Sequence, residues 1–319
     1  MIRPMTPVHP LHIVRRGAAP LYYSALRAFG VTAASRRLRD VGLILCYHNV
    51  VPTDGDPHGG PGLHMPCERF EKQMRWLSDH YEVVSLKELI GRMTAGASLR
   101  AMAAVTFDDA YAGVFEHALP ILEALEVPAT VFVVAEAIGR AAGFWWDRPE
   151  LVQSETPARR EKWLTAQRGD GEAILSADGC TGHRDAPAAH RPADEATLRS
   201  ALRRGIDLGV HSATHRSLPT LTDAELEYEL VTSRSIVHRA TGVCPELFAY
   251  PYGRWDARVR ARVRAAGYRA ALTLDAGLND ASSDLLALPR INVPAGISSA
   301  AFEAWTAGLQ ARGRPGWRA

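Results

Sequence analysis

The sequence is poor in cysteine, in net charge and in long apolar runs, and each shortage excludes a class of protein. Its four cysteines lie far apart and form no CxxC pair, which argues against a disulfide-stapled scaffold and favours a reducing compartment. The 37 basic residues nearly balance the 35 acidic ones, and a formal charge of +2 is too small to predict nucleic-acid binding. No apolar run has the length needed to span a bilayer.

The N-terminal segment 1–41 is expected to be a helical extension. Arg15 and Arg16, followed by an apolar stretch over 18–34, superficially resemble a twin-arginine export signal, but Arg27 interrupts the stretch and no clean cleavage site follows. A helix packed against the domain is the simpler interpretation. The alternative is peripheral contact with an anionic membrane surface. We therefore expect a cytoplasmic protein, with the inner membrane surface as its alternative location.

Length and hydrophobic periodicity predict one α/β domain. A chain of 319 residues with 47% hydrophobic side chains can bury one sizeable core. Short apolar runs alternate with amphipathic stretches, which is the pattern of βα units that build a parallel sheet or barrel. The expected strands are 43–47, 83–85, 103–107, 129–134, 206–210, 247–250 and 270–274, and the expected helices are 68–81, 86–93, 112–126, 223–240 and 257–266.

Two regions depart from this alternating pattern. The segment 147–200 mixes Pro, Gly, Asp and Arg with few periodic apolar residues, so we interpret it as an inserted, partly irregular segment of a domain that spans 42–298. The remainder, 299–319, is expected to form a C-terminal helix and tail.

Polar residues follow the predicted strands at the points where these strands end. His48 follows the first strand, Asp108 and Asp109 the third, His211 the strand 206–210, and the turn 251–253 the strand 247–250. In barrels and open α/β sheets the carboxyl ends of the strands form the active face. These local signals therefore predict one common site.

His211 and His215, four residues apart, are candidate metal ligands because a helical turn would place both imidazoles on one side. Asp109 would supply a third, anionic ligand and leave a position open for water, as in catalytic zinc sites. Chance spacing can produce such a histidine pair. The aspartates can equally be interpreted as the N-cap and first turn of a helix.

Together these motifs resemble the polysaccharide deacetylase family, carbohydrate esterase family 4, and most closely its poly-N-acetylglucosamine deacetylase branch. The resemblance extends over about 43–293 and adds further segments to the motifs above. These are Tyr47-His48, Leu119-Pro120-Ile121-Leu122, Pro128-Ala129-Thr130-Val131-Phe132, Phe144-Trp145-Trp146-Asp147 and Phe248-Ala249-Tyr250-Pro251-Tyr252-Gly253. It implies a distorted, incomplete (β/α) barrel preceded here by the N-terminal helical extension.

The resemblance also implies roles for individual residues. Asp109, His211 and His215 would bind a divalent metal, with zinc the expected ion, and Asp108 would be the general base. The backbone N–H of Tyr252, after Pro251, would hold the oxyanion. A divalent cation acidifies a bound water, and an unligated carboxylate beside it can take the proton of that water.

The chain departs from the better-known family pattern at three positions. Ala249 stands in the slot of an arginine that orients the catalytic aspartate, Arg290 stands where a general-acid histidine is usual, and Ala110 replaces a glycine. We expect His48 to support proton transfer or substrate binding, and Arg290 to orient Asp108. A structural histidine and a surface ion pair are the simpler alternatives.

The predicted reaction is hydrolysis of an N-acetyl group on an amino sugar such as N-acetylglucosamine, releasing acetate and a free amine. Tyr111, Trp145 and Trp146 are candidate sugar-stacking residues, although tryptophan suits core packing equally well. The alternatives are a hydrolase acting on a non-carbohydrate amide or a lipid-linked sugar, and a non-catalytic glycan-binding protein that kept the fold.

Overall fold

The computed structural model describes residues 19–54, 58–180 and 185–310, so Arg15 and Arg16 lie outside the described residues. The described chain divides into two compact units, one from 40 to 296 and one that combines the residues up to 39 with those from 297 onward. Within the described residues, no helix is both long enough and apolar enough to cross a membrane.

The larger unit is built on a parallel eight-stranded sheet with the strand order β10-β1-β5-β6-β7-β8-β9, and β4 pairs with β5 beside this path. Its strands are β1 (Gly42–Tyr47), β4 (Glu82–Val83), β5 (Met102–Phe107), β6 (Ala129–Val133), β7 (Asp207–Val210), β8 (Leu247–Ala249), β9 (Ala270–Leu272) and β10 (Ile291–Asn292). Neighbours in this path mostly follow one another along the chain, as in a (β/α) barrel, but β9 and β10 do not pair, so the barrel is incomplete.

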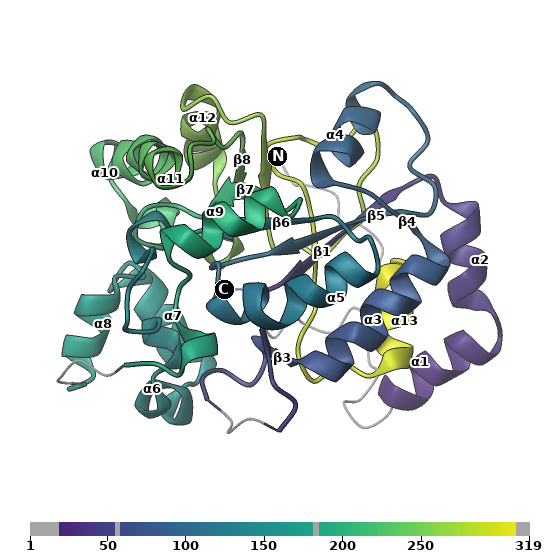
Figure 1. Ribbon diagram of the computed structural model, residues 1–319, viewed down its shortest axis with the longest axis horizontal. Helices are drawn as coiled ribbons and strands as arrows, with labels where there is room; N and C mark the ends of the chain where they lie inside the picture. The colour runs from purple at the N-terminus through teal and green to yellow at the C-terminus, as the bar shows by residue number, and fades with distance from the viewer. Residues whose placement is uncertain (1–18, 55–57, 181–184, 311–319) are drawn as a thin grey trace, which may run out of the picture. The chain divides into compact units, whose positions relative to one another are not determined.

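The helices of this unit are α3 (Cys67–His80), α4 (Leu86–Thr94), α5 (Leu119–Ala124), α6 (Pro149–Ser154), α7 (Pro157–Thr165), α8 (Gly171–Ala177), α9 (Glu195–Arg203), α10 (Asp223–Glu227), α11 (Ser233–Thr241) and α12 (Ala257–Ala265). Figure 1 shows α3, α5 and α9 lying over the sheet. Buried apolar side chains of α4 and of β1, β5, β6, β8 and β9 form one cluster of the core.

Two of the predicted helices are interrupted. The expected helix 112–126 contains a π turn at Val114–Ala118, followed by Leu119 and by Pro120, which has no backbone N–H to donate within a regular helix. The expected helix 223–240 contains a π turn at Tyr228–Thr232 between α10 and α11. Helix α10 begins with a capping box, because Thr222 and Glu225 exchange hydrogen bonds.

The segment 147–200 is more regular than its composition indicates. It contains α6, α7 and α8 and the start of α9, and three of the four helices begin with a side-chain cap, from Thr156, Asp170 and Asp194. A short parallel pair, β2 (Asn49–Val51) with β3 (His64–Pro66), was also not predicted. Both strands are only three residues long, which is too short for a periodicity signal.

The smaller unit contains three helices, α1 (Ala19–Ala28), α2 (Val31–Leu38) and α13 (Ser299–Thr306). Helix α13 packs against α1 and α2. The Trp305 indole N–H donates to the Tyr23 hydroxyl at 2.9 Å, and the Ser35 hydroxyl donates to the Ala307 carbonyl at 2.9 Å. The first two and the last of the described helices therefore pack together, an association that their separate sequence patterns do not reveal.

Candidate active site

The turn after β5 presents the two aspartates on a strained backbone. Asp109 and Ala110 both have left-handed φ angles, 71° and 52°, a conformation that costs non-glycine residues about 1–2 kcal/mol each. The helical turn that follows begins after Tyr111, so the aspartates are not its N-cap and first turn. Ala110 thus adopts the conformation for which a glycine would be preferred, as the family pattern has at this position.

The loop after β7 brings His211 and His215 together without a helix. Ser212 and His215 have left-handed φ angles of 65° and 63°, and the loop forms no helical turn. The expectation of a helical turn from the four-residue spacing was therefore wrong. The His215 N–H donates to the Ser212 hydroxyl at 2.9 Å, and the Nε2 atoms of the two histidines are 3.1 Å apart. The reversal of the backbone, and not a helical turn, brings the two imidazoles together.

Asp109 completes a buried cluster with these histidines. Its Oδ1 lies 3.6 Å from Nε2 of His211 and 3.3 Å from Nε2 of His215, and all three side chains are buried. This Oδ1 has no hydrogen-bond partner among the described residues. A buried carboxylate oxygen without a partner is costly, and a cation would satisfy it.

The protonation of this cluster also fits a cation. Burial lowers the pKa of both His211 and His215, so their imidazoles are neutral and have lone pairs to donate. Burial, and then the negative charges of Asp108 and Asp147, raise the pKa of Asp109 well above its ordinary value. A divalent cation would reverse that effect, because it favours the carboxylate. Two neutral imidazoles and one carboxylate are a zinc-type donor set.

Different contacts orient the two imidazoles. His211 Nδ1–H donates to the Ala249 carbonyl at 2.8 Å, which leaves Nε2 facing the cluster. His215 has no hydrogen-bond partner for Nδ1 among the described residues. Its ring instead packs against Trp146 and Tyr252, with centroids 4.5 and 4.4 Å away.

Glu229 holds the loop between His211 and His215, a role that was not predicted from the sequence. Its Oε2 accepts the N–H groups of Ala213 and Thr214, both at 2.9 Å, and its Oε1 accepts the Thr214 hydroxyl. The side chain is buried, on the same helical face as Leu226 and Leu230. An acidic residue on the apolar face of a predicted helix was the signal that could have identified it.

Arg290 approaches Asp108 from inside the barrel. The register of β10 on β1 pairs Ile291 with Leu45, so Arg290 starts below the strand ends. Its Nη1 and Nη2 donate to the two oxygens of Asp108 at 2.8 and 2.7 Å, and Nη1 also donates to the Thr106 hydroxyl at 3.2 Å. Both charged side chains are buried, so the surface ion pair considered for Arg290 is not what the structure contains.

The charge of Arg290 determines the state of Asp108. Burial by itself would raise the pKa of Asp108, but the positive charge and hydrogen bonds of Arg290 hold it well below its usual range. Asp108 is therefore an ionised carboxylate beside the cluster, 3.8 Å from His211 Nε2. Because the guanidinium donates a hydrogen bond to each oxygen of Asp108, it fixes the orientation of the carboxylate as well as its charge.

His48 and Cys46 also lie close to Asp108. Their nitrogen and sulfur atoms and an Asp108 oxygen all lie within 4.8 Å of one another, and the Cys46 thiol donates to Asp108 Oδ2 at 3.4 Å. A second cation here would meet the positive charge of Arg290, so we assign no ion to this group. Burial lowers the pKa of His48 to about 4, so its imidazole is neutral near neutral pH.

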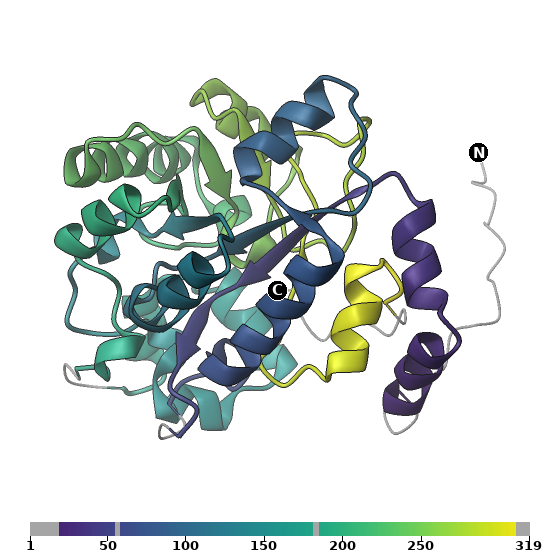
Figure 2. The same cartoon turned by 45° about the vertical axis from the view of Figure 1, so that its right-hand side comes forward.

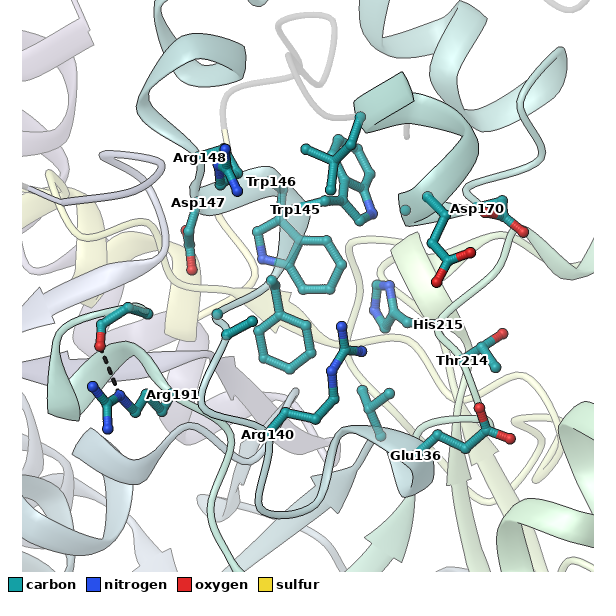
Figure 3. Close-up of a pocket in the computed structure, with 18 of the residues that line it drawn as sticks. Glu136, Arg140, Trp145, Trp146, Asp147, Arg148, Asp170, Arg191, Thr214 and His215 are labelled. Atoms are coloured by element: carbon teal, nitrogen blue, oxygen red, sulfur yellow. Dashed lines mark hydrogen bonds between the residues drawn. The ribbon is translucent and has the colours of Figure 1, made fainter. Parts of the chain in front are cut away.

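A pocket of about 1260 Å³ opens beside His215. Figure 3 shows Trp146 and His215 next to each other near its centre, with Arg140 pointing into the pocket. Trp145 and Trp146 line it but each is only 8% exposed, and Phe144 stacks on Trp146 with centroids 4.5 Å apart. The tryptophans therefore form a wall of the pocket with little open ring surface, and both the sugar-stacking role and the packing role stay predictions.

A buried network holds Trp146 in that wall. Its indole N–H donates to the Tyr111 hydroxyl at 2.8 Å, and that hydroxyl donates to Asp147 Oδ2 at 2.7 Å. His64 Nε2 lies 2.8 Å from Asp147 Oδ1. Tyr111 has no exposed surface, so in this structure it supports Trp146 and does not line the pocket as a sugar-stacking residue.

Strain is concentrated at this site. Of the eight non-glycine residues with left-handed backbone in the described ranges, five belong to the site: Asp109, Ala110, Ser212, His215 and Tyr252. Tyr252, at φ 57°, lies in the short 3-10 turn Pro251–Gly253 that follows β8. Strained residues persist where the surrounding structure holds them, and they cluster at functional sites.

Comparison with known proteins gives this geometry a context. Residues 96–271, more than half of the chain, match the sequence profile of a family described as polysaccharide deacetylase. A Bacillus subtilis protein named as a polysaccharide deacetylase is 22% identical over 264 residues, which cover 82% of this chain and 75% of that protein. A Staphylococcus aureus poly-β-1,6-N-acetyl-D-glucosamine N-deacetylase is 32% identical over 72 residues, 22% of this chain and 25% of that protein.

Solved structures share the fold. A polysaccharide deacetylase from Bacillus cereus superposes with a TM-score of 0.60 at 18% identity, covering 85% of this chain and 69% of that one. IcaB from Ammonifex degensii superposes with a TM-score of 0.59 at 18% identity, covering 84% and 98%. These likenesses confirm the predicted distorted, incomplete (β/α) barrel.

Proposed function

The chain belongs to the polysaccharide deacetylase family, whose carbohydrate-esterase-type enzymes hydrolyse amide bonds of acetylated sugars, and from this we propose that it is a metal-dependent N-deacetylase of an amino-sugar-containing glycan. The proposal rests on one observation. The Asp109–His211–His215 cluster lies beside an ionised carboxylate, Asp108, that is held in place by Arg290.

Asp109, His211 and His215 would hold the cation, for which zinc is the expected identity. When bound, the cation would polarise the acetamide carbonyl and lower the pKa of a water molecule. The His211 Nδ1–H bond to the Ala249 carbonyl and the packing of His215 on Trp146 keep the two rings facing Asp109. Ligands fixed in advance in this way lose little conformational entropy on binding the metal.

Asp108 is the proposed general base. It accepts a proton from the attacking water while the water oxygen bonds to the acetyl carbon. Arg290 acts through Asp108, because it keeps the carboxylate ionised and aimed. The backbone N–H of Tyr252 donates to the oxyanion that develops on the former carbonyl oxygen.

The departing nitrogen needs a proton when the C–N bond breaks and acetate leaves. We assign His48 to this half of the reaction, either in delivering the proton or in binding the sugar beside it. Its place next to Asp108, which has just accepted a proton from water, supports that role. The neutral state of its imidazole also allows it to donate one hydrogen bond and accept another.

The proposed substrate is an N-acetylglucosamine-containing polysaccharide or precursor. An aromatic wall with polar groups around it suits a sugar ring, and Trp145 and Trp146 line the pocket beside His215. We assign the binding of the acetyl group and its sugar to these two residues and to Pro251 and Tyr252, because the Tyr252 ring packs on His215. The named activity of the Staphylococcus aureus relative supports this choice of sugar.

Metal content measured by elemental analysis, together with acetate release from N-acetylglucosamine oligomers, tests the proposal. We expect one zinc per chain and acetate release that is abolished by chelation and by Asp108→Asn. The matched control is Asp79→Asn, an exposed carboxylate on α3. Bound zinc without acetate release from any oligomer would overturn the glycan assignment in favour of a lipid-linked sugar or another amide. Full release by the metal-free protein would overturn the metal dependence.

A further inference from the structure

Residues 19–39, the N-terminal helix pair, carry an unusual share of exposed apolar side chains. The described residues include seven large hydrophobic side chains that are exposed, and four of them lie in this stretch. They are Leu21 (76% exposed), Phe29 (83%), Val31 (39%) and Leu38 (76%). Single exposed apolar residues are ordinary, but a group of this density indicates an interaction surface.

Helix geometry gathers these side chains on outward faces. In α1, Leu21, Ala25 and Ala28 have the spacing i, i+4, i+7 and share one face, while Tyr23 points inward and bonds Trp305. Figure 2 shows α1 and α2 as two consecutive purple helices joined at a bend.

In α2 the spacing i, i+3, i+7 places Val31, Ala34 and Leu38 on one face, while Thr32 is buried and Ser35 bonds the Ala307 carbonyl. Each helix therefore uses one face to pack within its own unit and leaves an apolar face exposed. Phe29, in the bend between them, is the most exposed of these residues.

The charges of the pair have a single sign. The stretch 19–39 contains Arg27, Arg36, Arg37 and Arg39 and no acidic residue. Arg27 is partly neutralised by Glu303, 3.3 Å away, whereas Arg37 and Arg39 are exposed at the end of α2. Apolar faces flanked by arginine are the signature of a helix that lies in a membrane interface.

We propose that the N-terminal helix pair docks on an anionic phospholipid surface, with Leu21, Phe29 and Leu38 inserted among the acyl chains and the arginines at the headgroups. A second copy of this chain fits less well, since a symmetric contact would set the same arginines against each other. The lipid surface accommodates both features, because each arginine near anionic lipids strengthens binding by about fivefold. The proposal does not depend on the metal chemistry.

Co-sedimentation of the full chain with vesicles tests this directly. We expect binding to vesicles of equal parts phosphatidylcholine and phosphatidylglycerol, little binding to pure phosphatidylcholine, and loss of binding as salt is raised. The triple variant Leu21→Ser/Phe29→Ser/Leu38→Ser should weaken the partition coefficient by at least about tenfold. Arg37→Gln/Arg39→Gln should weaken it by more than about tenfold.

Val243→Ser is the matched control, since it removes an exposed apolar side chain from the larger unit and should leave binding unchanged. Circular dichroism and acetate release from a soluble oligomer should be the same for all variants. Equal binding to both vesicle types, or unaltered binding by the triple variant, would overturn the proposal. A wild-type dimer in light scattering that the triple variant converts to a monomer would do so as well, because it would assign the surface to a second copy.

Discussion

The guanidinium of Arg290 donates to both carboxylate oxygens of Asp108, at 2.8 and 2.7 Å, in a barrel interior where neither side chain meets solvent. The two residues are 182 positions apart in the chain. The attraction and hydrogen bonds within a complete buried pair offset the cost of removing both charges from water, whereas removing one partner leaves the other charge buried and unpaired.

Arg290→Met should therefore lower both stability and activity. We expect a loss of about 3–5 kcal/mol in the free energy of unfolding, measured with urea, because an unpaired carboxylate would remain buried. The double variant Arg290→Met/Asp108→Asn should recover much of that stability and remain inactive. If Arg290→Met kept the wild-type rate and pH profile, Arg290 would have no role in orienting or ionising Asp108.

Metal removal should destabilise the folded chain. A ligand present at a hundred times its Kd adds about 2.7 kcal/mol, so chelation should lower the Tm measured by calorimetry. Chelation should lower the Tm of His215→Ala by less than it lowers the Tm of the wild type, because the variant lacks one proposed ligand. The control is His238→Ala, an exposed histidine on α11. A Tm that zinc and chelators leave unchanged in the wild type would contradict the assigned ligands.

His48→Ala separates proton transfer from binding. Proton transfer by a positioned side chain contributes about 10²–10⁴-fold to a rate, so its loss should lower kcat and change the pH–rate profile. A binding role would instead raise KM and leave kcat and its pH dependence unchanged. His48→Gln, which retains a hydrogen-bond donor and acceptor, should rescue binding only. An unchanged profile, kcat and KM would leave the structural histidine as the explanation.

Tyr111→Phe should disturb the pocket through Trp146. The substitution removes the partner of the Trp146 N–H and of Asp147 Oδ2, at a cost of about 1–3 kcal/mol, while Asp147 Oδ1 keeps its contact with His64. Steady-state kinetics should show a lower kcat/KM as well. Tyr268→Phe is the control, because its buried hydroxyl bonds the Leu230 carbonyl and neither residue lines the pocket. Equal kinetic losses in both variants would show that Tyr111 acts only on general stability.

The Glu225 carboxylate should make stability depend on acid pH. Its hydrogen bond from the Thr222 N–H, followed by that from Arg168, lowers the pKa of Glu225 to about 2. An unfolded glutamate titrates near about 4.3, so the stabilisation is complete above that pH and is lost as the pH falls toward 2.

Urea unfolding of Glu225→Gln against pH measures this contribution. Glutamine keeps the capping box, so the difference from the wild type should be largest near neutral pH and shrink between about pH 4.3 and 2. Glu227→Gln, an exposed residue on the same helix, is the control. A pH-independent difference would show that the charge of Glu225 does not contribute.

The sequence alone determined the parallel α/β architecture and the positions of most strands. The alternation of apolar and polar residues and the continuous apolar runs that mark strands are local properties of a chain, and so are the turn residues that end them. For the same reason it located Asp108, Asp109 and His211 at strand ends. The capping box at Thr222 and the end of α11 at Gly242, where φ is 80°, are likewise set by residues next to one another in the chain.

Tertiary structure alone decided how these residues are held. The pairing of Arg290 with Asp108 depends on the register of β10 against β1, and the support from Glu229 depends on how a helix packs beneath the histidine loop. The left-handed backbone that turns His215 toward Asp109 is maintained by packing and by no glycine. Periodicity reports which residues face a core, but it carries no information about which distant partners meet there, because that is decided by register and packing between elements far apart in the chain.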